Sequence, residues 1–442
     1  MRFESRRRRL LVVAAIAAIA VPALVWLFMT PRDEAEAGAR PLAEAIRGER
    51  GVLPRATVAA VKSAASVASD ASLGHGPDEV QVCGGAWIKF ESDGSFDQAE
   101  FERATQLPRA RAAILAKLNA EPDEMTRLAG VLMAAIDQDD QHRRALIGLP
   151  ATCDGAECAA TQAADADVAQ AREAIARAAL ASSDPKVYAL ALNVCSTHRE
   201  GTCQMLGARQ LARLDPGNAS PWLQILDDAT ARRDVGAQTE ALYRIANAER
   251  NEFGAFAVAG AVLKVAPTDD RSALASFAMA VTAVGVEAAW ALRGYQAVGQ
   301  LCRVDALRDA NRAQVCAGVA SVLAERSDRM IARYIGAAIG TRIGWPVERA
   351  EQMRGEYNAY ATSLVSSGDE QRKDFSCTRI RRELDRLRQM AALGEVGAMR
   401  EWVARSDKTP ADFVLLERTR QQQAQRAAQE AAASAAAASA GR

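Results

Sequence analysis

Residues 214–250 read LDPGNASPWLQILDDATARRDVGAQTEALYRIANAER, a stretch that contains two helical runs. An Asp-Pro-Gly turn precedes the first run, and a short charged segment separates it from the second. Ala, Leu, Gln, Arg and Glu are strong helix formers, and two helices joined by a short link pack as antiparallel neighbours. The stretch therefore predicts one antiparallel helical hairpin.

The same pattern extends outward from this hairpin. Several helix starts combine a capping side chain with proline in the first turn, where the missing N–H costs nothing: Asp184-Pro185, Ser220-Pro221 and Thr409-Pro410, with Thr268-Asp269-Asp270 as a start of the capping kind. Chain breaks fall at residues 148–150, 182–183, 215–217 and 266–267. Aromatic residues make up only 5% of the chain and alternating β-branched runs are scarce, so the sequence predicts an all-α body. Residues 80–96 are the one place where a short hairpin of strands is expected.

Residues 216–250 resemble a tetratricopeptide repeat. The proline turn and Trp222 occupy the expected places around the first helix, although Ala229 stands where tyrosine is usual. The second helix carries small, large and small side chains at the repeat's spacing: Ala241, Ile245 and Ala248. The resemblance, which is clearest over residues 184–250, implies stacked antiparallel helical hairpins in a tetratricopeptide-like solenoid whose concave face binds peptides or proteins. A generic α-helical bundle is the alternative.

The N-terminal region predicts a single membrane anchor. Residues 10–29, LLVVAAIAAIAVPALVWLFM, carry no charge, and twenty helical residues span about 30 Å, the thickness of a hydrocarbon core. The arginines at positions 6–9 favour a cytoplasmic N-terminus. A cleaved signal peptide with its site at Ala35-Glu36-Ala37 is the alternative. Both interpretations place residues 33 onward outside the cytoplasm, and we expect a protein of the bacterial inner membrane with a periplasmic body.

Composition divides the chain into five parts. A basic cytoplasmic N-terminus (1–9) and the transmembrane anchor (10–29) precede a small, polar flexible tether (30–79). An all-helical periplasmic body is expected over residues 80–407. Residues 408–442 become low in complexity and predict a tail that passes from helical to disordered.

Cysteine usage points to disulfides. The chain has an even number of cysteines, and an oxidising compartment favours their pairing. Spacing suggests local pairs and one distant pair: Cys153 with Cys158, Cys195 with Cys203, Cys302 with Cys316, and Cys83 with Cys377. Zinc binding by the 153–158 segment, or by Cys195, His198 and Cys203, is the alternative, although only the first has a usual zinc spacing.

The local pairs impose a geometric condition. Residues eight apart on one helix lie about 12 Å apart, whereas the Cα atoms of bonded cysteines lie within about 7 Å. A bond between Cys195 and Cys203 therefore requires the chain to reverse between Ser196 and Thr202. By the same reasoning, a turn must separate Cys302 from Cys316.

Glycines in residues 330–345 predict close helix packing. Gly336, Gly340 and Gly344 recur at four-residue spacing. In a lipid bilayer this pattern favours helix association. Here Arg333 and Arg342 interrupt an already short segment, so we expect packing in a soluble core.

No chemical motif stands out in the chain. The only histidines, His75, His142 and His198, do not belong to recognisable catalytic or metal-binding patterns. Basic and acidic residues balance at 55 each, which gives no case for nucleic-acid binding. We therefore expect a non-enzymatic scaffold or adaptor, without cofactor or metal, that is anchored through residues 10–29 and binds another envelope protein or a peptide.

Two other functions remain open from the sequence. One is an envelope enzyme whose site is assembled from acids and arginines that no motif marks, and the other is a purely structural helical bundle. A deep polar pocket would favour the enzyme, whereas a shallow groove would favour the binding protein.

Overall fold

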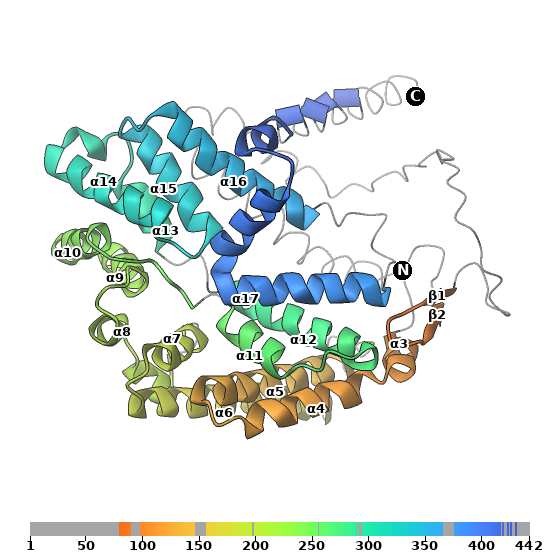
Figure 1. The fold of residues 1–442 in the computed structure, drawn as a ribbon. Coiled ribbons are helices and arrows are strands. Elements are labelled where there is room, and N and C mark those ends of the chain that lie inside the picture. The colour runs from red at the N-terminus through yellow and green to blue at the C-terminus, as the bar shows by residue number, and fades with distance from the viewer. Residues whose placement is uncertain are drawn as a thin grey trace, which may run out of the picture. The chain divides into compact units, whose positions relative to one another are not determined.

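The fold is known from a computed structural model. It describes residues 79–89, 98–145, 156–196, 199–254, 256–288, 290, 294–365, 375–416 and short stretches between 418 and 430. These residues are predominantly helical (Figure 1), which confirms the all-α prediction. The anchor expected at residues 10–29 and most of the tether lie outside the described residues. Within the described ranges, no helix combines the length and the apolar character needed to cross a bilayer.

The first described element is a hairpin of two short strands. Strands β1 (Glu79–Gln81) and β2 (Trp87–Lys89) pair antiparallel, which confirms the expected hairpin. Gly84 and Gly85 form its turn with φ values of 102° and 90°, a region that favours glycine. Residues 90–96 of the segment in which the hairpin was expected lie outside the described residues.

Helices follow one another to the end of the body. The first group comprises α3 (Gln98–Thr105), α4 (Leu107–Ala120), α5 (Glu124–Ala145), α6 (Ala156–Ala181) and α7 (Pro185–Val194). The second comprises the 3₁₀ helix η1 (Gly201–Met205), α8 (Ala208–Leu214), α9 (Ser220–Ala231), α10 (Val235–Ala246), α11 (Ala257–Val265) and α12 (Asp270–Ala288). The third comprises α13 (Tyr295–Leu301), η2 (Ala306–Arg308), α14 (Ala310–Glu325), α15 (Met330–Arg342), α16 (Val347–Val365) and α17 (Cys377–Arg405).

The helix starts largely follow the capping signals. The carboxylate of Asp184 accepts a hydrogen bond from the Lys186 N–H at 2.8 Å, and Pro185 begins α7. The carboxylate of Asp269 accepts from the Ser272 N–H at 3.1 Å. Both side chains satisfy N–H groups that the first helical turn leaves unpaired, which confirms these two starts.

The expected cap at Ser220 is wrong. Helix α9 begins at Ser220 itself, and the preceding Ala219 provides no side-chain cap. The side-chain oxygen of Asn218 accepts from the Ser220 N–H at 3.0 Å and from the Glu252 N–H at 3.0 Å. The buried Asn218 therefore takes the capping role expected of Ser220, because its side-chain oxygen binds an N–H at the start of α9 and an N–H in the chain after α10.

Consecutive helices pack side by side, but the chain also returns to earlier helices. Helices α4 to α7 pack in succession, as do α9 with α10 and α14 to α16. Helices α11 and α12 pack against α4 and α5 and also against α17, while α10 lies against α14 (Figure 1). In a simple solenoid each repeat contacts only its neighbours. The returns of α11 and α12 depart from that pattern.

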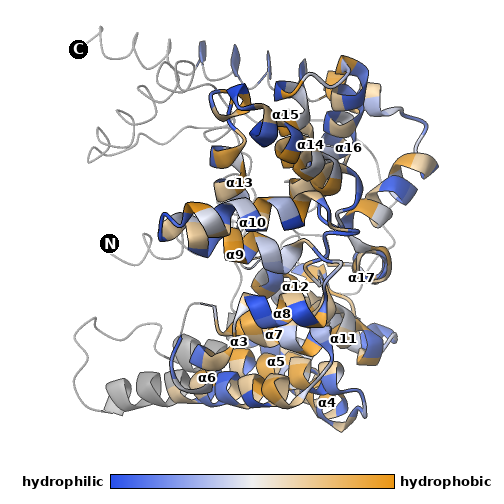
Figure 2. Ribbon diagram, turned by 90° about the vertical axis from the view of Figure 1, so that its left-hand side faces the viewer, coloured by the Kyte–Doolittle hydropathy of each residue, from blue (hydrophilic) through white to orange (hydrophobic). Residues whose placement is uncertain are grey.

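Apolar and polar residues are interspersed along the described helices (Figure 2), and the buried residues are mainly apolar. The predicted small and large residues of α10, Ala241 and Ile245, are fully buried, as is Leu223 of α9. Phe413 is also buried, and its ring centroid lies 5.2 Å from that of Trp402. The packing of Phe413 brings the first residues after 407 into the helical body.

Two of the three spaced glycines allow close contact. A Cβ on Gly336 of α15 would lie 2.5 Å from the Ala324 nitrogen and 2.7 Å from the Ala320 oxygen, both on α14. Gly340 leaves room for the ring of Trp345. Gly344 serves a different purpose, because it adopts a φ of 86° in the turn that follows α15. The expected close packing of helices is therefore confirmed at Gly336, whereas Gly340 accommodates a side chain from the turn after its own helix.

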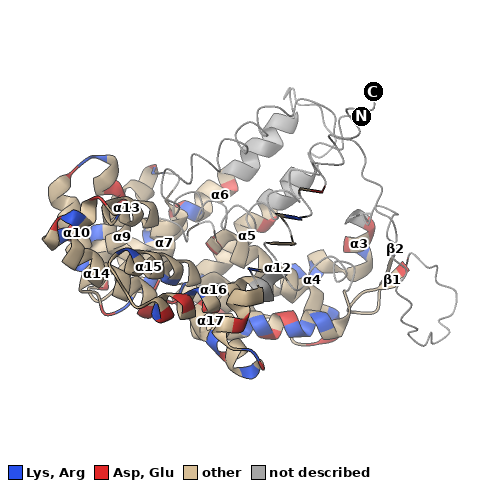
Figure 3. Cartoon of the chain, turned by 90° about the horizontal axis from the view of Figure 1, so that it is seen from above, with Lys and Arg blue, Asp and Glu red and all other residues tan. Residues whose placement is uncertain are grey.

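Charges of both signs lie along α17 (Figure 3). Arg388 pairs with Asp385 at 2.9 Å, and Arg386 lies 3.9 Å from Glu383, each one helical turn apart. Such pairs on a helix surface stabilise it by only a few tenths of a kcal/mol.

Candidate functional site

The candidate binding site is a groove between α10 and the segment formed by α13, η2 and α14. It encloses about 930 Å³. Its lining includes Thr239, Glu240, Leu242, Tyr243, Gln300, Leu301, Arg303, Asp309, Arg312 and Val315. Leu242 is buried, while Tyr243 keeps 57% of its surface exposed. The groove therefore has apolar side chains beside an accessible, partly charged rim, as peptide-binding surfaces commonly have.

The acidic residues that line the groove have partners, and its two arginines are the groups left to consider. The carboxylate of Asp309 accepts from the Arg312 N–H at 2.7 Å and caps α14, and Glu240 lies 3.7 Å from Arg209. Within the described part of the chain, the guanidinium groups of Arg303 and Arg312 form no ion pair. The groove consequently offers two cationic groups for an acidic ligand.

A second polar cluster lies inside the molecule, where three connecting segments meet. These are the chain after α10, the link between α14 and α15, and the bend of α17 at Gly394, which has a φ of 70°. The side chain of Asn251 donates to the Ser327 hydroxyl at 3.0 Å, and its N–H donates to the Arg326 carbonyl at 2.9 Å. In turn, the Asp328 N–H donates a hydrogen bond to the Asn251 carbonyl at 3.2 Å. We call this cluster the junction and define it as Glu287, Asn251, Ser327, Asp328, Arg329 and Glu395.

Arg329 is the central cation of the junction. Its guanidinium donates to the Glu395 carboxylate at 2.9 Å, and the other oxygen of that carboxylate accepts from the Met330 N–H at 2.9 Å. The guanidinium also lies 5.7 Å from the ring centroid of Phe256. Glu395 thus joins α17 to the start of α15, with the positive charge of Arg329 balancing it.

Two buried acids of the junction have raised pKa values. Burial raises the pKa of Glu287 to about 7, against the opposing effect of the Val258 and Ala259 N–H groups that its carboxyl group accepts from. Burial likewise raises the pKa of Asp328 to about 6, although nearby Arg329 lowers it. Removing a carboxylate from water disfavours its charged form, and the hydrogen bonds and the arginine only partly offset this cost.

These pKa values predict stability that falls as the pH rises from 5 to 8. The unfolded chain ionises both acids from about pH 5 upward, whereas the fold retains their protons up to about pH 6 at Asp328 and about pH 7 at Glu287. Unfolding therefore releases protons, and a higher pH favours it. We expect the Glu287→Gln variant to lose less stability than the wild type between pH 5 and pH 8, by roughly 3 kcal/mol. Urea unfolding of both proteins at each pH measures this difference.

The matched control for Glu287→Gln is the exposed Glu240→Gln, which should follow the wild-type pH dependence. A constant cost of the new amide cancels in the comparison between the two pH values. If Glu287→Gln and the wild type lose equal stability over this range, Glu287 does not carry the proton that its burial implies.

The junction is not an accessible catalytic site. Glu287 is 2% exposed and Arg329 is 6% exposed, so neither can meet a substrate without a change in the packing. The groove contains none of the junction residues. The sequence reasoning missed the junction, although Glu287 is a lone acid within the apolar run AVTAVGVEAAWA, which is a signal of a buried, hydrogen-bonded carboxyl group.

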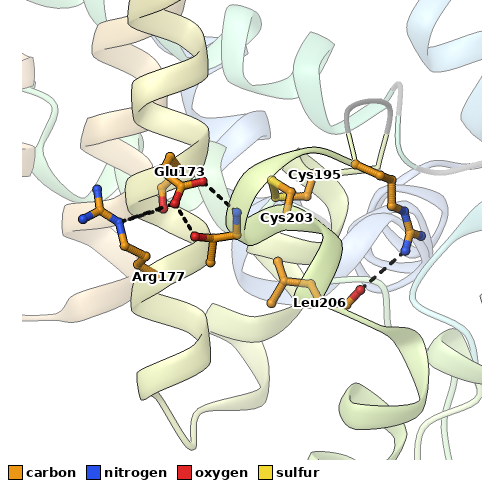
Figure 4. Close-up of a disulfide and its surroundings, with 7 residues drawn as sticks. Glu173, Arg177, Cys195, Cys203 and Leu206 are labelled. Carbon is orange, nitrogen blue, oxygen red and sulfur yellow. Dashed lines mark hydrogen bonds and ion pairs between the residues drawn. A yellow bond between two sulfur atoms is a disulfide. The ribbon is translucent and has the colours of Figure 1, made fainter.

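The pair Cys195 and Cys203 lies at a chain reversal (Figure 4). Helix α7 ends at Val194, η1 begins at Gly201, and the Cα atoms of the bonded cysteines lie 5.3 Å apart. The predicted reversal between Ser196 and Thr202 is therefore present.

Helix α6 holds this turn through Glu173 (Figure 4). The Glu173 carboxylate accepts from the Thr202 N–H at 3.0 Å and from its hydroxyl, and these bonds lower the pKa of Glu173. Arg177, one turn further along α6, lies 3.9 Å from the same carboxylate. Contacts from a separate helix thus reinforce the disulfide-linked turn.

The other cysteines divide between described and undescribed residues. Cys302 and Cys316 are bonded across the turn that contains η2, with Cα atoms 5.8 Å apart. Cys83 and Cys377 are bonded with Cα atoms 4.4 Å apart and connect β1–β2 to α17. Cys153 and the side chain of Cys158 lie outside the described residues, as do the side chains of all three histidines.

The cysteines 83 and 377 also form a cluster with Asp270. Their ligand atoms lie within 4.8 Å of one another, as in a metal site. A metal binds the thiolate form of cysteine, and in the disulfide neither sulfur is a thiolate. The bonded pair therefore offers no cysteine ligand.

Comparison of this chain with models of protein families, with curated proteins and with solved structures finds no match.

Proposed function

We propose that this protein is a non-enzymatic, membrane-anchored periplasmic scaffold or adaptor that binds another envelope protein. The observation that carries the proposal is the open groove along α10. It has exposed side chains at its rim and two arginines that form no ion pair with any residue the structure describes. An open groove with an accessible rim suits an extended or helical segment of a partner better than it suits a small substrate.

The proposed architecture is a short tetratricopeptide-like solenoid. The hairpin of α9 and α10 and the helices α14 to α16 pack in succession, and α10 contacts α14. The residues behind the resemblance, Ala241, Ile245 and Ala248, are buried as such a hairpin requires. In this arrangement the groove is the seam between one hairpin and the next pair of helices.

The proposed location rests on the N-terminal sequence and on the cysteines. Residues 10–29 have the length and apolar character of a transmembrane helix, and the arginines before them favour a cytoplasmic start. The bonded cysteine pairs suit an oxidising compartment. Together these features support an inner-membrane anchor and a periplasmic body.

The groove also suggests the chemistry of the partner. Arg303 and Arg312 can donate charge-assisted hydrogen bonds to carboxylates, while the partly exposed Leu301 and Val315 offer apolar contact. We therefore propose a peptide segment that combines acidic and apolar side chains.

Photo-crosslinking in cells tests the proposed function. A photoreactive benzoyl-phenylalanine in place of Tyr243 is expected to capture one defined envelope protein, because this side chain lies at the rim of the groove. The same group in place of Val281, which is 46% exposed on α12, serves as the control and should not capture that protein.

Charge reversal adds a second readout to the crosslinking. The paired substitution Arg303→Glu and Arg312→Glu should reduce the yield of the adduct at position 243 at least tenfold. Equal capture from positions 243 and 281, or an adduct that charge reversal leaves unchanged, would count against a partner in this groove.

A further inference from the structure

The three disulfides of the described residues differ in accessibility. Cys195, Cys203, Cys302 and Cys316 are each at most 2% exposed. Cys377 is only partly buried, and a hollow of about 460 Å³ opens onto both Cys377 and Cys83. Thiol–disulfide exchange needs an external thiolate to reach a sulfur atom, so accessibility separates this bond from the other two.

The hollow exists because the turn between β1 and β2 carries no side chains. Gly84 and Gly85 line it, and a Cβ on Gly85 would have no heavy atom within 4 Å. Asp270 and Arg271, at the start of α12, form the opposite wall. The space beside the two sulfurs is therefore left open by the turn rather than filled by packing.

We propose that the Cys83–Cys377 bond is a thiol–disulfide exchange site that reacts with a dithiol while the other two disulfides stay closed. A thiolate of the dithiol attacks Sγ of Cys377, and the bond to Cys83 breaks. Cys83 leaves as a thiolate and takes up a proton. The second thiol of the reagent then attacks its own sulfur in the mixed disulfide, and Cys377 leaves as a thiolate. The dithiol is oxidised to a disulfide, and the protein gains two thiols.

The geometry selects Cys377 as the sulfur that is attacked. Cys83 is 3% exposed, whereas Cys377 is the first residue of α17, directly after its cap Ser376. The N-terminus of a helix stabilises a thiolate, which makes Cys377 a good leaving group in the second step. The carbonyl oxygen of Asp270 lies 3.3 Å from Sγ of Cys83 and can accept a hydrogen bond from the Cys83 thiol after the first step.

Opening this bond removes the covalent connection between the β1–β2 hairpin and α17. The bond spans 294 residues of sequence, the longest separation of the three described disulfides. A backbone hydrogen bond also connects the hairpin to the residues just before α17, from the Cys83 N–H to the Phe375 carbonyl at 2.8 Å, and Arg381 of α17 pairs with Asp270 of α12. Exchange would therefore loosen the attachment of the hairpin without unfolding the helical body.

Reduction of the folded, full-length protein tests this proposal. Dithiothreitol is the probe, samples are quenched with iodoacetamide at intervals, and mass spectrometry quantifies the alkylated peptides. We expect Cys83 and Cys377 to be alkylated at least ten times faster than the cysteines at 195, 203, 302 and 316, while circular dichroism keeps its helical signal. Equal rates for the three disulfides, or earlier reduction of either of the two buried disulfides, would overturn the proposal.

Two further measurements identify the attacked sulfur. Glutathione, a monothiol, should leave its adduct on Cys377 of the wild-type protein after acid quenching, and an adduct on Cys83 contradicts the assignment. In single variants, the Cys377 thiol of Cys83→Ser should react with iodoacetamide at least tenfold faster than the Cys83 thiol of Cys377→Ser. Comparable rates would show that α17 gives Cys377 no advantage.

Discussion

Replacing Arg329 with methionine is expected to destabilise the protein by about 3 to 5 kcal/mol. The substitution keeps much of the side-chain volume but removes the charge that faces Glu395 at 2.9 Å. It would leave the carboxylates of Glu395 and Asp328 buried without a cation, and a buried charge without its partner is far more costly than a surface charge. The junction joins three segments, so we expect the loss to appear in global unfolding.

Urea unfolding monitored by circular dichroism measures this loss. The control is Arg405→Met, which removes an exposed guanidinium from Glu401 and should cost less than about 1 kcal/mol. The double variant Arg329→Met with Glu395→Met should be more stable than Arg329→Met alone, because the uncompensated carboxylate is then absent. If the two single arginine variants lose similar stability, the junction is not the electrostatic centre that its burial indicates.

The second large effect is expected from Gly294→Ala, at about 3 kcal/mol or more. Gly294 has a φ of 78°, which L-residues adopt at a cost of roughly 1 to 2 kcal/mol. A Cβ there would also lie 2.6 Å from the carbonyl carbon of Leu223 in α9, and overpacking against a backbone adds about 1 to 3 kcal/mol. The position therefore combines conformational strain with a clash between α13 and α9.

Two matched glycines separate these contributions. Gly344 has a φ of 86° with nothing within 4 Å of a Cβ, so Gly344→Ala should show the conformational cost alone, about 1 kcal/mol. Gly207 has an extended φ of −148° and open space, so Gly207→Ala should change stability by less than about 0.5 kcal/mol. Thermal or urea unfolding of the three variants should rank them in this order. A Gly294→Ala loss no larger than that of Gly344→Ala contradicts the close packing of α13 on α9.

The difference between Asp184 and Ser220 shows when a capping pattern in the sequence predicts the hydrogen bond at a helix start. Both precede proline, and both were expected to cap a helix. Asp184 does so, because its cap uses only the N–H groups of its own helix. At α9 the role passes to Asn218, which also binds the Glu252 N–H 34 residues away. A local pattern predicts a local hydrogen bond, but it cannot show when a side chain must serve two distant segments.

The groove and the junction had weaker signals in the sequence. Tyr243, Arg303 and Arg312 look like ordinary surface residues of separate helices, and the groove exists only because α10 packs beside α14. Glu287 carried a recognisable signal as an acid in an apolar run, but its partners lie on α11 and, through the charge of Arg329, just before the start of α15. The pairing of such groups depends on which helices meet, and helical periodicity does not specify that.

The sequence by itself determined the helical character of the body, the short hairpin at its start and the chain reversals demanded by two cysteine pairs. These features depend on backbone preferences, capping bonds and the reach of a disulfide, all of which act within a few residues. Only the tertiary structure decided that α11 and α12 pack against the earlier helices α4 and α5, and that the charge of Arg329 compensates buried acids. It also decided that Cys377 is partly exposed, whereas the cysteines of the other two disulfides are buried. Burial and charge compensation arise between segments far apart in the chain, so they follow from the packing of whole helices.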